Sequence, residues 1–288
     1  MVNTHQGLNQ NIITNGCLQL LYLNGIDTSE TSREAIKTYT EHLDIIIVFD
    51  GEISLKVFNQ KQTLKAGDLF FCTRSTYAEI HTDKGPFSCA RLRFIKDKLP
   101  LGHSIKNRFA ASVLESGIIK QKILNHCLSY IDLFETSVDT IDEKEALMIH
   151  QENLEILSIL DIMISQEHKN LKIIEHKLVD ADIVVEAINI LEENFVKAPK
   201  INNIVKQLGI SHSYFVRIFK RNIGATPNIF ASTLKINYSL SLISLKTESL
   251  CDISYLLGFT DQSHFCNSFK QHLQITPSNA INNTFNKA

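Results

Sequence analysis

The chain has 288 residues, of which 44% are hydrophobic and 21% charged, and its formal net charge at pH 7 is −2. This composition excludes wholesale disorder, and the length exceeds what one hydrophobic core usually supports, so we expect two domains. No apolar run approaches the ~18 residues of a membrane helix, and we expect no secretory signal, because residues 1–16 are polar. Six scattered cysteines without a C-x-x-C pair favour reduced thiols in a cytoplasmic protein.

The charge is distributed unevenly along the chain. Residues 1–100 carry 11 Lys/Arg and 11 Asp/Glu, residues 101–180 carry 8 and 13, and residues 181–288 carry 10 and 7. A basic C-terminal part is typical of a protein that binds a polyanion, but chance variation also produces an asymmetry of this size. Charge alone therefore does not decide between these interpretations.

Short apolar runs separated by turn residues predict β-strands over the first ~95 residues. Leu43–Phe49 is rich in Ile and Val, and the following Asp50-Gly51 is typical of a tight hairpin leading into the alternating run Ile53–Phe58. Further strands are predicted at Leu69–Cys72, after the turn Ala66-Gly67-Asp68, and at Tyr77–His81 and Phe87–Phe94. Closely spaced strands without intervening helices predict a barrel or a sandwich.

The pattern becomes helical from about residue 105 to 197, where Gly and Pro are scarce. Leucines at helical spacing, with glutamates among them, predict an amphipathic helix over 143–165. That helix would be a connector, a dimer interface or a helix packed on its own domain. We place the boundary at the polar stretch Gln166–Asn170, which gives domains 1–175 and 181–288.

Two segments of the C-terminal part are similar at an offset of 50 residues without gaps, Ser213–Pro227 and Ser263–Pro277. Six of the 15 aligned positions are identical, where chance gives about one. The identical pairs are Ser213/Ser263, Phe215/Phe265, Phe219/Phe269, Lys220/Lys270, Thr226/Thr276 and Pro227/Pro277. This repeat indicates a duplicated structural unit.

Each copy has the pattern of a helix-turn-helix unit. In the first, a short helix over Ile201–Leu208 ends at Gly209, and Ser211 caps the next helix. In the second, the short helix is Asp252–Leu257, its terminator is Gly258, and Thr260 or Asp261 is the cap. A helix over Thr233–Leu245, with Leu234, Tyr238, Leu242 and Leu245 on one face, is predicted to connect the two units.

The helical phase separates a core face from a DNA-reading face in both copies. The core face carries Phe215, Phe219 and Ile223 in copy one and Phe265, Phe269 and Leu273 in copy two. The opposite face carries Ser213, Arg217 and Lys220, and likewise Ser263, Asn267 and Lys270. Arg reads guanine, Asn reads adenine and Lys neutralises phosphate. We therefore expect both helices to enter successive major grooves, roughly 34 Å apart.

Residues from roughly Val184 to Ile281 resemble the AraC/XylS-type bacterial transcription regulators, most clearly in Ile204–Phe219 and Asp252–Lys270. The resemblance implies a seven-helix domain with two helix-turn-helix units, a cupin-like N-terminal domain, double-stranded DNA and RNA polymerase as partners, and a homodimer. The expected DNA-binding residues are Ser213, Val216, Arg217, Lys220, Arg221, Gln262, Ser263, His264, Asn267 and Lys270. Departures from the family pattern are Lys235 for Arg, Ser239 and Ser254 for Ala, and Gln274 for Gly.

The expected fold class is therefore α+β, with an N-terminal cupin-like β-barrel and a C-terminal all-α domain. Family barrels bind a small effector, dimerise or both, and the candidate effector-binding residues are His42, His81, Arg91 and Arg93. The two arginines share one strand face and suit a carboxylate or a sugar ligand, or they are ordinary surface residues.

Two other functional classes remain open at this point. A cupin-type metal enzyme needs several converging ligands, and only Glu41-His42 and Glu79/His81 offer any, so we expect no metal, no cofactor and no enzymatic activity. A thiol redox sensor would use Cys72 and Cys89, but neither has an obvious cluster that stabilises a thiolate.

Overall fold

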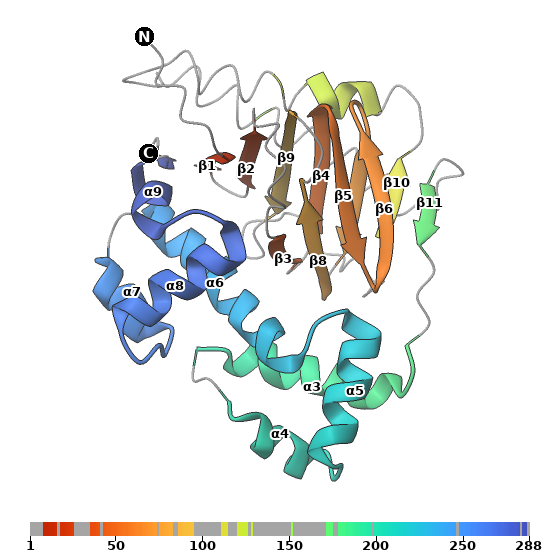
Figure 1. Ribbon diagram of the computed structural model, residues 1–288, viewed down its shortest axis with the longest axis vertical. Coiled ribbons are helices and arrows are strands. Elements are labelled where there is room, and N and C mark those ends of the chain that lie inside the picture. Colours follow the sequence, from red (N-terminus) through yellow and green to blue (C-terminus); the bar gives the residue numbers. More distant parts are fainter. Residues whose placement is uncertain are drawn as a thin grey trace.

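A computed structural model describes residues 8–15, 18–25, 35–40, 43–73, 75–82, 86–94, 111–114, 120–125, 128, 151, 171–174, 178–196, 199–245, 248–282 and 284–286. The N-terminal part consists mainly of strands and the C-terminal part mainly of helices, which confirms the predicted α+β class (Figure 1). In the described part of the chain, no helix is both long and apolar enough to cross a membrane.

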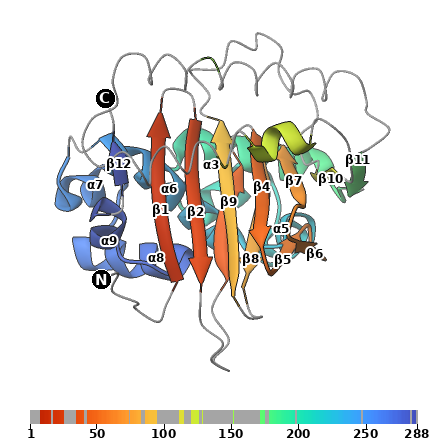
Figure 2. The same cartoon turned by 90° about the horizontal axis from the view of Figure 1, so that it is seen from above.

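The strands form two sheets. The eight-stranded sheet has the order β11-β10-β7-β4-β9-β2-β1-β12, and Figure 2 shows β1, β2, β9 and β4 side by side. Its strands are β1 (Leu8–Asn15), β2 (Leu18–Gly25), β4 (Leu43–Asp50), β7 (Leu69–Thr73), β9 (Phe87–Phe94), β10 (Ala111–Leu114), β11 (Leu171–Ile174) and β12 (Thr284–Asn286). The four-stranded sheet, in the order β3-β8-β5-β6, contains β3 (Ile36–Thr40), β5 (Glu52–Val57), β6 (Gln60–Lys65) and β8 (Thr76–His81).

The two sheets pack through buried apolar side chains, as the alternating pattern predicted. Ile53, Leu55 and Val57 alternate with more exposed residues along β5, and they join Ile46 and Phe70 of the other sheet in one core. Across the described residues the sheets remain separate in their hydrogen bonding, so the arrangement is sandwich-like.

One predicted turn is wrong. Asp50-Gly51 does not join paired strands, because β4 pairs with β7 and β9 while β5 pairs with β6 and β8. The Asp-Gly pair instead carries the chain from one sheet to the other. Gly51 has φ 72°, and a Cβ there would lie 2.2 Å from the Pro86 carbonyl oxygen, so only glycine fits.

The tight hairpin of this region joins β5 to β6. Its two central residues, Phe58 and Asn59, both have positive φ, 50° and 62°. Two consecutive left-handed residues are typical of the turn that suits the twist of paired strands. Phe58 is buried in the core, whereas Asn59 is exposed at the tip of this hairpin.

Between residues 178 and 282 the described chain forms the seven helices that the family resemblance implies. They are α3 (Ala181–Asn194), α4 (Ile201–Gln207), α5 (His212–Ile223), α6 (Pro227–Leu245), α7 (Leu250–Leu256), α8 (Gln262–Leu273) and α9 (Pro277–Asn282). The helix-turn-helix units are α4–α5 and α7–α8, and their turns contain Gly209 and Gly258, each with φ 66°. This confirms the predicted helix pairs and their glycine terminators.

The connecting helix differs from its prediction in both its start and its buried face. It begins at Pro227, because Thr226 caps it by accepting from the Ile229 N–H at 3.4 Å. Tyr238, predicted to face the core, is 37% exposed and packs edge-on against Phe195. The helix is buried on several sides, as expected for an element that touches both units and the sheets. Its buried residues are Pro227, Phe230, Thr233, Leu234, Lys235, Ile236, Asn237, Ser239, Leu240 and Ile243.

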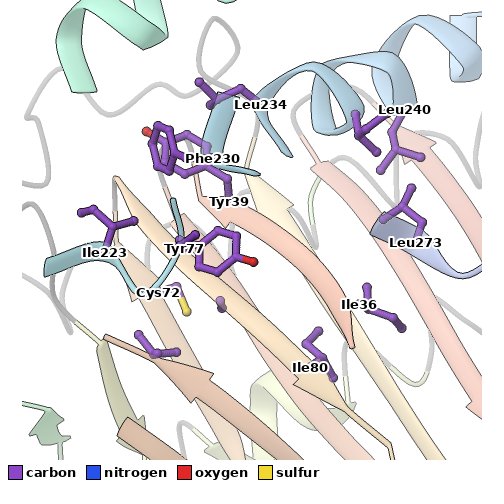
Figure 3. Close-up of a cluster of buried hydrophobic side chains, with 14 of the residues drawn as sticks. Ile36, Tyr39, Cys72, Tyr77, Ile80, Ile223, Phe230, Leu234, Leu240 and Leu273 are labelled. Atoms are coloured by element: carbon purple, nitrogen blue, oxygen red, sulfur yellow. The ribbon is translucent and has the colours of Figure 1, made fainter. Parts of the chain in front are cut away.

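The helices and the sheets share a continuous core, in which Tyr39 of β3 lies beside Phe230 of α6 (Figure 3). Its ring lies 4.9 Å from that of Phe230 on α6, edge to face. Its hydroxyl donates to Glu192 of α3, which also accepts from Ser75 at 2.9 Å. Asn237 of α6 donates to the Tyr39 carbonyl at 3.0 Å. At Tyr39, polar and apolar contacts therefore join the N-terminal sheets to helices α3 and α6.

Two predictions concern residues that, apart from Gln151, lie outside the described ones, namely the amphipathic helix over 143–165 and the polar boundary stretch Gln166–Asn170. The described chain shows β11 ending at Ile174 and α3 beginning at Ala181. It also shows β12, near the C-terminal end, pairing in parallel with β1.

Candidate nucleic-acid interface

Helix α5 is defined at both ends by its sequence. Ser211 adopts an extended conformation and its Oγ accepts from the Tyr214 N–H at 3.3 Å, as the predicted cap should. At the other end Gly224 takes φ 93°, and its N–H donates to the Lys220 carbonyl. Phe215 and Phe219 are fully buried and fix the rotation of the helix.

The opposite face of α5 is open. Ser213, Arg217, Lys220 and Arg221 are exposed, and Val216 is partly exposed. Together with His212 and Asn59 these residues line an open groove. The predicted set of DNA-binding residues on the first unit thus forms one contiguous, positively charged surface.

Helix α8 repeats this arrangement. Asp261 rather than Thr260 is the cap, because its Oδ1 accepts from the His264 N–H at 2.7 Å. That hydrogen bond lowers the pKa of Asp261, so the cap is charged and suits the helix N-terminus. Phe265 and Phe269 are fully buried, and the predicted residues Gln262, Ser263, His264, Asn267 and Lys270 are all exposed.

The C-terminal end of α8 shows the effect of one departure from the family pattern. Gln274 stands where copy one has Gly224, and it adopts φ 63° and ψ 8° in the left-handed region. A residue with a Cβ is strained there. Its Nε2 donates to the Gln271 carbonyl at 3.1 Å. The prediction that the backbone conformation at this turn is unfavourable for Gln274 is confirmed.

The other departures are buried in the helical core. The Oγ atoms of Ser239 and Ser254 donate to the backbone carbonyls of Ile236 and Cys251, at 2.7 and 2.8 Å, which satisfies hydroxyls in an apolar setting. Lys235 lies with its Nζ 3.5 Å from the Gly258 carbonyl and 5.1 Å from the centroid of the Phe259 ring. Burial lowers the pKa of Lys235. Lys235 thus ties α6 to the turn of the second unit.

Three contacts hold α5 that the sequence did not indicate. Asn222 donates to the Val179 carbonyl at 2.9 Å and accepts from the Val179 N–H at 2.7 Å. The Tyr214 hydroxyl donates to Asp180 at 2.5 Å, and this hydrogen bond raises the pKa of Tyr214. Asn59, on the β5–β6 hairpin, donates to the Lys220 and Arg221 carbonyls at 3.2 and 3.1 Å.

The structure describes three of the four candidate effector residues, His81, Arg91 and Arg93. His42 lies outside the described residues, and the Nε2 of His81 lies 3.6 Å from the Oε2 of Glu79 on the same strand. Arg91 and Arg93 do share one face of β9, but both are buried, so the interpretation as surface arginines is wrong.

The two arginines form a polar cluster between the sheets. Arg93 donates to both carboxylate oxygens of Asp44, from Nε at 3.1 Å and from a terminal nitrogen at 3.0 Å, and also to the Tyr39 carbonyl. Arg91 donates to Thr38 of β3. The negative charge of Asp44 makes burial of the arginines tolerable. The sequence did not predict this ion pair, because Asp44 lies in an apolar strand and its partner Arg93 lies 49 residues further along the chain.

The structure also bears on the two alternative classes. Burial raises the pKa of Cys89 to about 12 and also raises that of Cys72, so both thiols are protonated at neutral pH and neither is a reactive thiolate. Within the described ranges, no three His, Cys, Asp or Glu side chains lie close enough to hold a metal ion.

Comparisons with known proteins find transcription regulators that are similar to this chain. Residues 204–283 match the model of a helix-turn-helix domain. The lactose operon transcription activator of Staphylococcus xylosus is 25% identical over 236 residues, which cover 81% of each chain. The thermoregulatory protein LcrF of Yersinia pestis is 25% identical over 252 residues, which cover 82% of this chain and 88% of LcrF. These similarities support the predicted resemblance to the AraC/XylS-type transcription regulators.

The fold of this regulator extends the similarity to the N-terminal part. ToxT from Vibrio cholerae O395 superposes with a TM-score of 0.53 at 11% identity, over 97% of this chain and 98% of ToxT. The chain therefore has a ToxT-like two-domain fold. The helix-turn-helix match and the similar transcription activators support binding of double-stranded DNA by the C-terminal domain.

Proposed function

We propose that this regulator binds a specific operator with α5 and α8 in successive major grooves, and that domains 1–175 and 181–288 divide regulation from DNA binding. The observation that carries the proposal is the repeated geometry of the two helices. In each, paired phenylalanines are fully buried and the opposite face is exposed and free of acidic residues. One continuous helix, α6, joins the two units and so sets the distance between them.

The proposed base-reading residues are Ser213, Val216 and Arg217 on α5 and Gln262, Ser263, His264 and Asn267 on α8. Lys220, Arg221 and Lys270 would bind phosphates. Because α8 carries no Arg at the position of Arg217, we expect contacts of the first unit to dominate specificity.

The test is the base preference of two matched variants, Arg217→Ala and Asn267→Ala. Each should relax the preference in a different half of the operator, at a cost of about 1–3 kcal/mol of binding free energy. The larger loss should belong to Arg217→Ala. If that variant keeps the wild-type preference while Asn267→Ala abolishes it, the expectation that the first unit dominates specificity is wrong.

The N-terminal domain supplies regulation in this proposal, as a cytoplasmic homodimer that senses a small effector and acts on RNA polymerase without catalysis of its own. Several relatives bear the names of transcription activators, which supports activation rather than repression. Solved structures of ToxT hold an unsaturated fatty acid and a substituted butenoic acid, so a carboxylic acid is the first effector to test.

The effector test compares thermal unfolding of the protein with and without oleic acid, followed by operator binding. Stabilisation with a changed operator affinity supports sensing, and the absence of both removes oleic acid as the effector. Elemental analysis of the purified protein tests the proposal that no catalytic metal is used, because a stoichiometric metal would revive the cupin-enzyme alternative.

A further inference from the structure

The β5–β6 hairpin reaches from the N-terminal domain to the first recognition helix, as Figure 1 shows. The amide of Asn59 donates to the carbonyls of Lys220 and Arg221 at the C-terminal end of α5. A Cβ added at Gly224 would lie 3.5 Å from the Asn59 backbone nitrogen, so the hairpin tip is also in close contact with the helix terminator. The tip therefore contacts the C-terminal end of the DNA-reading helix directly.

The hairpin tip leaves the DNA-reading face of α5 open. Ser213, Arg217, Lys220 and Arg221 remain exposed although Asn59 lines the same groove. An obstructing segment would bury these side chains or oppose them with acidic groups. The side chains on this face are exposed, and residues 58–61 contain no acidic side chain, so neither kind of obstruction is present. The tip is an edge of the groove and does not cover it.

The chemistry of the tip matches that of a nucleic-acid backbone. Asn59, Gln60 and Lys61 are exposed, and the hairpin thus continues the positive charge of Lys220 and Arg221 onto the N-terminal domain. Two residues of extended chain span about 7 Å, so Lys61 follows closely after Asn59, which contacts the end of α5. A lysine next to a helix in the major groove is placed to contact a flanking phosphate. Among the described residues, Lys61 has no ion-pair partner, whereas Lys56 on the same hairpin is paired with Glu79 at 3.1 Å.

We propose that the β5–β6 hairpin is a third DNA-contacting element, in which Lys61 binds a backbone phosphate next to the site read by α5. The inference rests on the proposed function, because it takes α5 to enter the major groove. It gives the N-terminal domain a direct part in DNA affinity. Sequence preference stays with the two recognition helices, because a phosphate contact carries no base information.

The test measures the affinity of the full-length protein for its operator over a range of salt concentrations. Lys61→Ala should weaken binding by about fivefold to tenfold at low salt, and the slope of log affinity against log salt should become shallower by about 0.9. Lys61→Arg should restore both values, and the base preference should be unchanged. Lys65→Ala is the matched control, since Lys65 is an exposed lysine on the same strand but four residues further from the tip, and it should behave as wild type.

Two results would overturn the inference. If Lys61→Ala and Lys65→Ala both keep the wild-type affinity and salt slope, the hairpin makes no phosphate contact. If Lys61→Ala binds more tightly than wild type, the hairpin hinders DNA. The failure of the proposed function looks different, because then Arg217→Ala would also leave operator affinity and base preference unchanged.

Discussion

Replacing Asp44 by Asn should destabilise the N-terminal domain severely. Asp44 and Arg91 are each 1% exposed and Arg93 is 4% exposed, so the carboxylate is the buried counter-charge of two arginines. Asn keeps the size of the side chain but removes its charge, and its NH2 group would face arginine donors. Breaking a buried ion pair on one side costs about 3–5 kcal/mol, a large part of the total stability of about 5–15 kcal/mol.

Urea unfolding of the full-length protein measures this cost, as a shift of the transition midpoint at an unchanged slope. Asp68→Asn is the control, because Asp68 is partly exposed, pairs with Lys120 at 3.4 Å, and as Asn can still accept from the Lys65 N–H. That variant should lose less than about 1 kcal/mol. Equal losses in the two variants would refute the reasoning that Asp44 compensates buried charge.

Two further predictions concern the second helix-turn-helix unit. Gln274→Gly should stabilise the protein by about 0.5–1 kcal/mol, because it relieves the left-handed strain at φ 63°. Thermal unfolding measures this change, and a lower stability of the variant would mean that the Nε2 hydrogen bond to the Gln271 carbonyl outweighs the strain. The pKa of His272 is lowered in the folded protein, chiefly by burial and further by Lys37, so the unfolded chain takes up the proton first as the pH falls. The free energy of unfolding should decline below about pH 6.5, and a His272→Gln variant with the same decline as wild type would contradict this assignment.

The C-terminal half could be predicted from the sequence almost completely, because the determinants are local. Ser211 and Gly224 act on the helix that they flank, and the 50-residue repeat gives the phase of both recognition helices. The strained turn at Gln274 was also predictable, since copy one has glycine there.

What the sequence did not show depends on partners far apart in the chain. Asp50-Gly51 looks like a hairpin, yet Gly51 is required by its close approach to Pro86 in a change of sheet. Asp44 and Arg93 are 49 residues apart, and Asn59 is 161 residues from Lys220, so no local pattern marks either pair. Tyr238 faces solvent because α6 is buried on several sides, which a single apolar stripe does not describe.

The most direct test of DNA recognition by the two units is selection of random DNA duplexes by the full-length protein at two salt concentrations. We expect affinity that falls steeply with salt and an enriched motif that spans two successive turns of the major groove, one for α5 and one for α8. Salt-sensitive binding without enrichment would contradict specific recognition. Absence of binding at low salt would contradict DNA binding by these helices altogether.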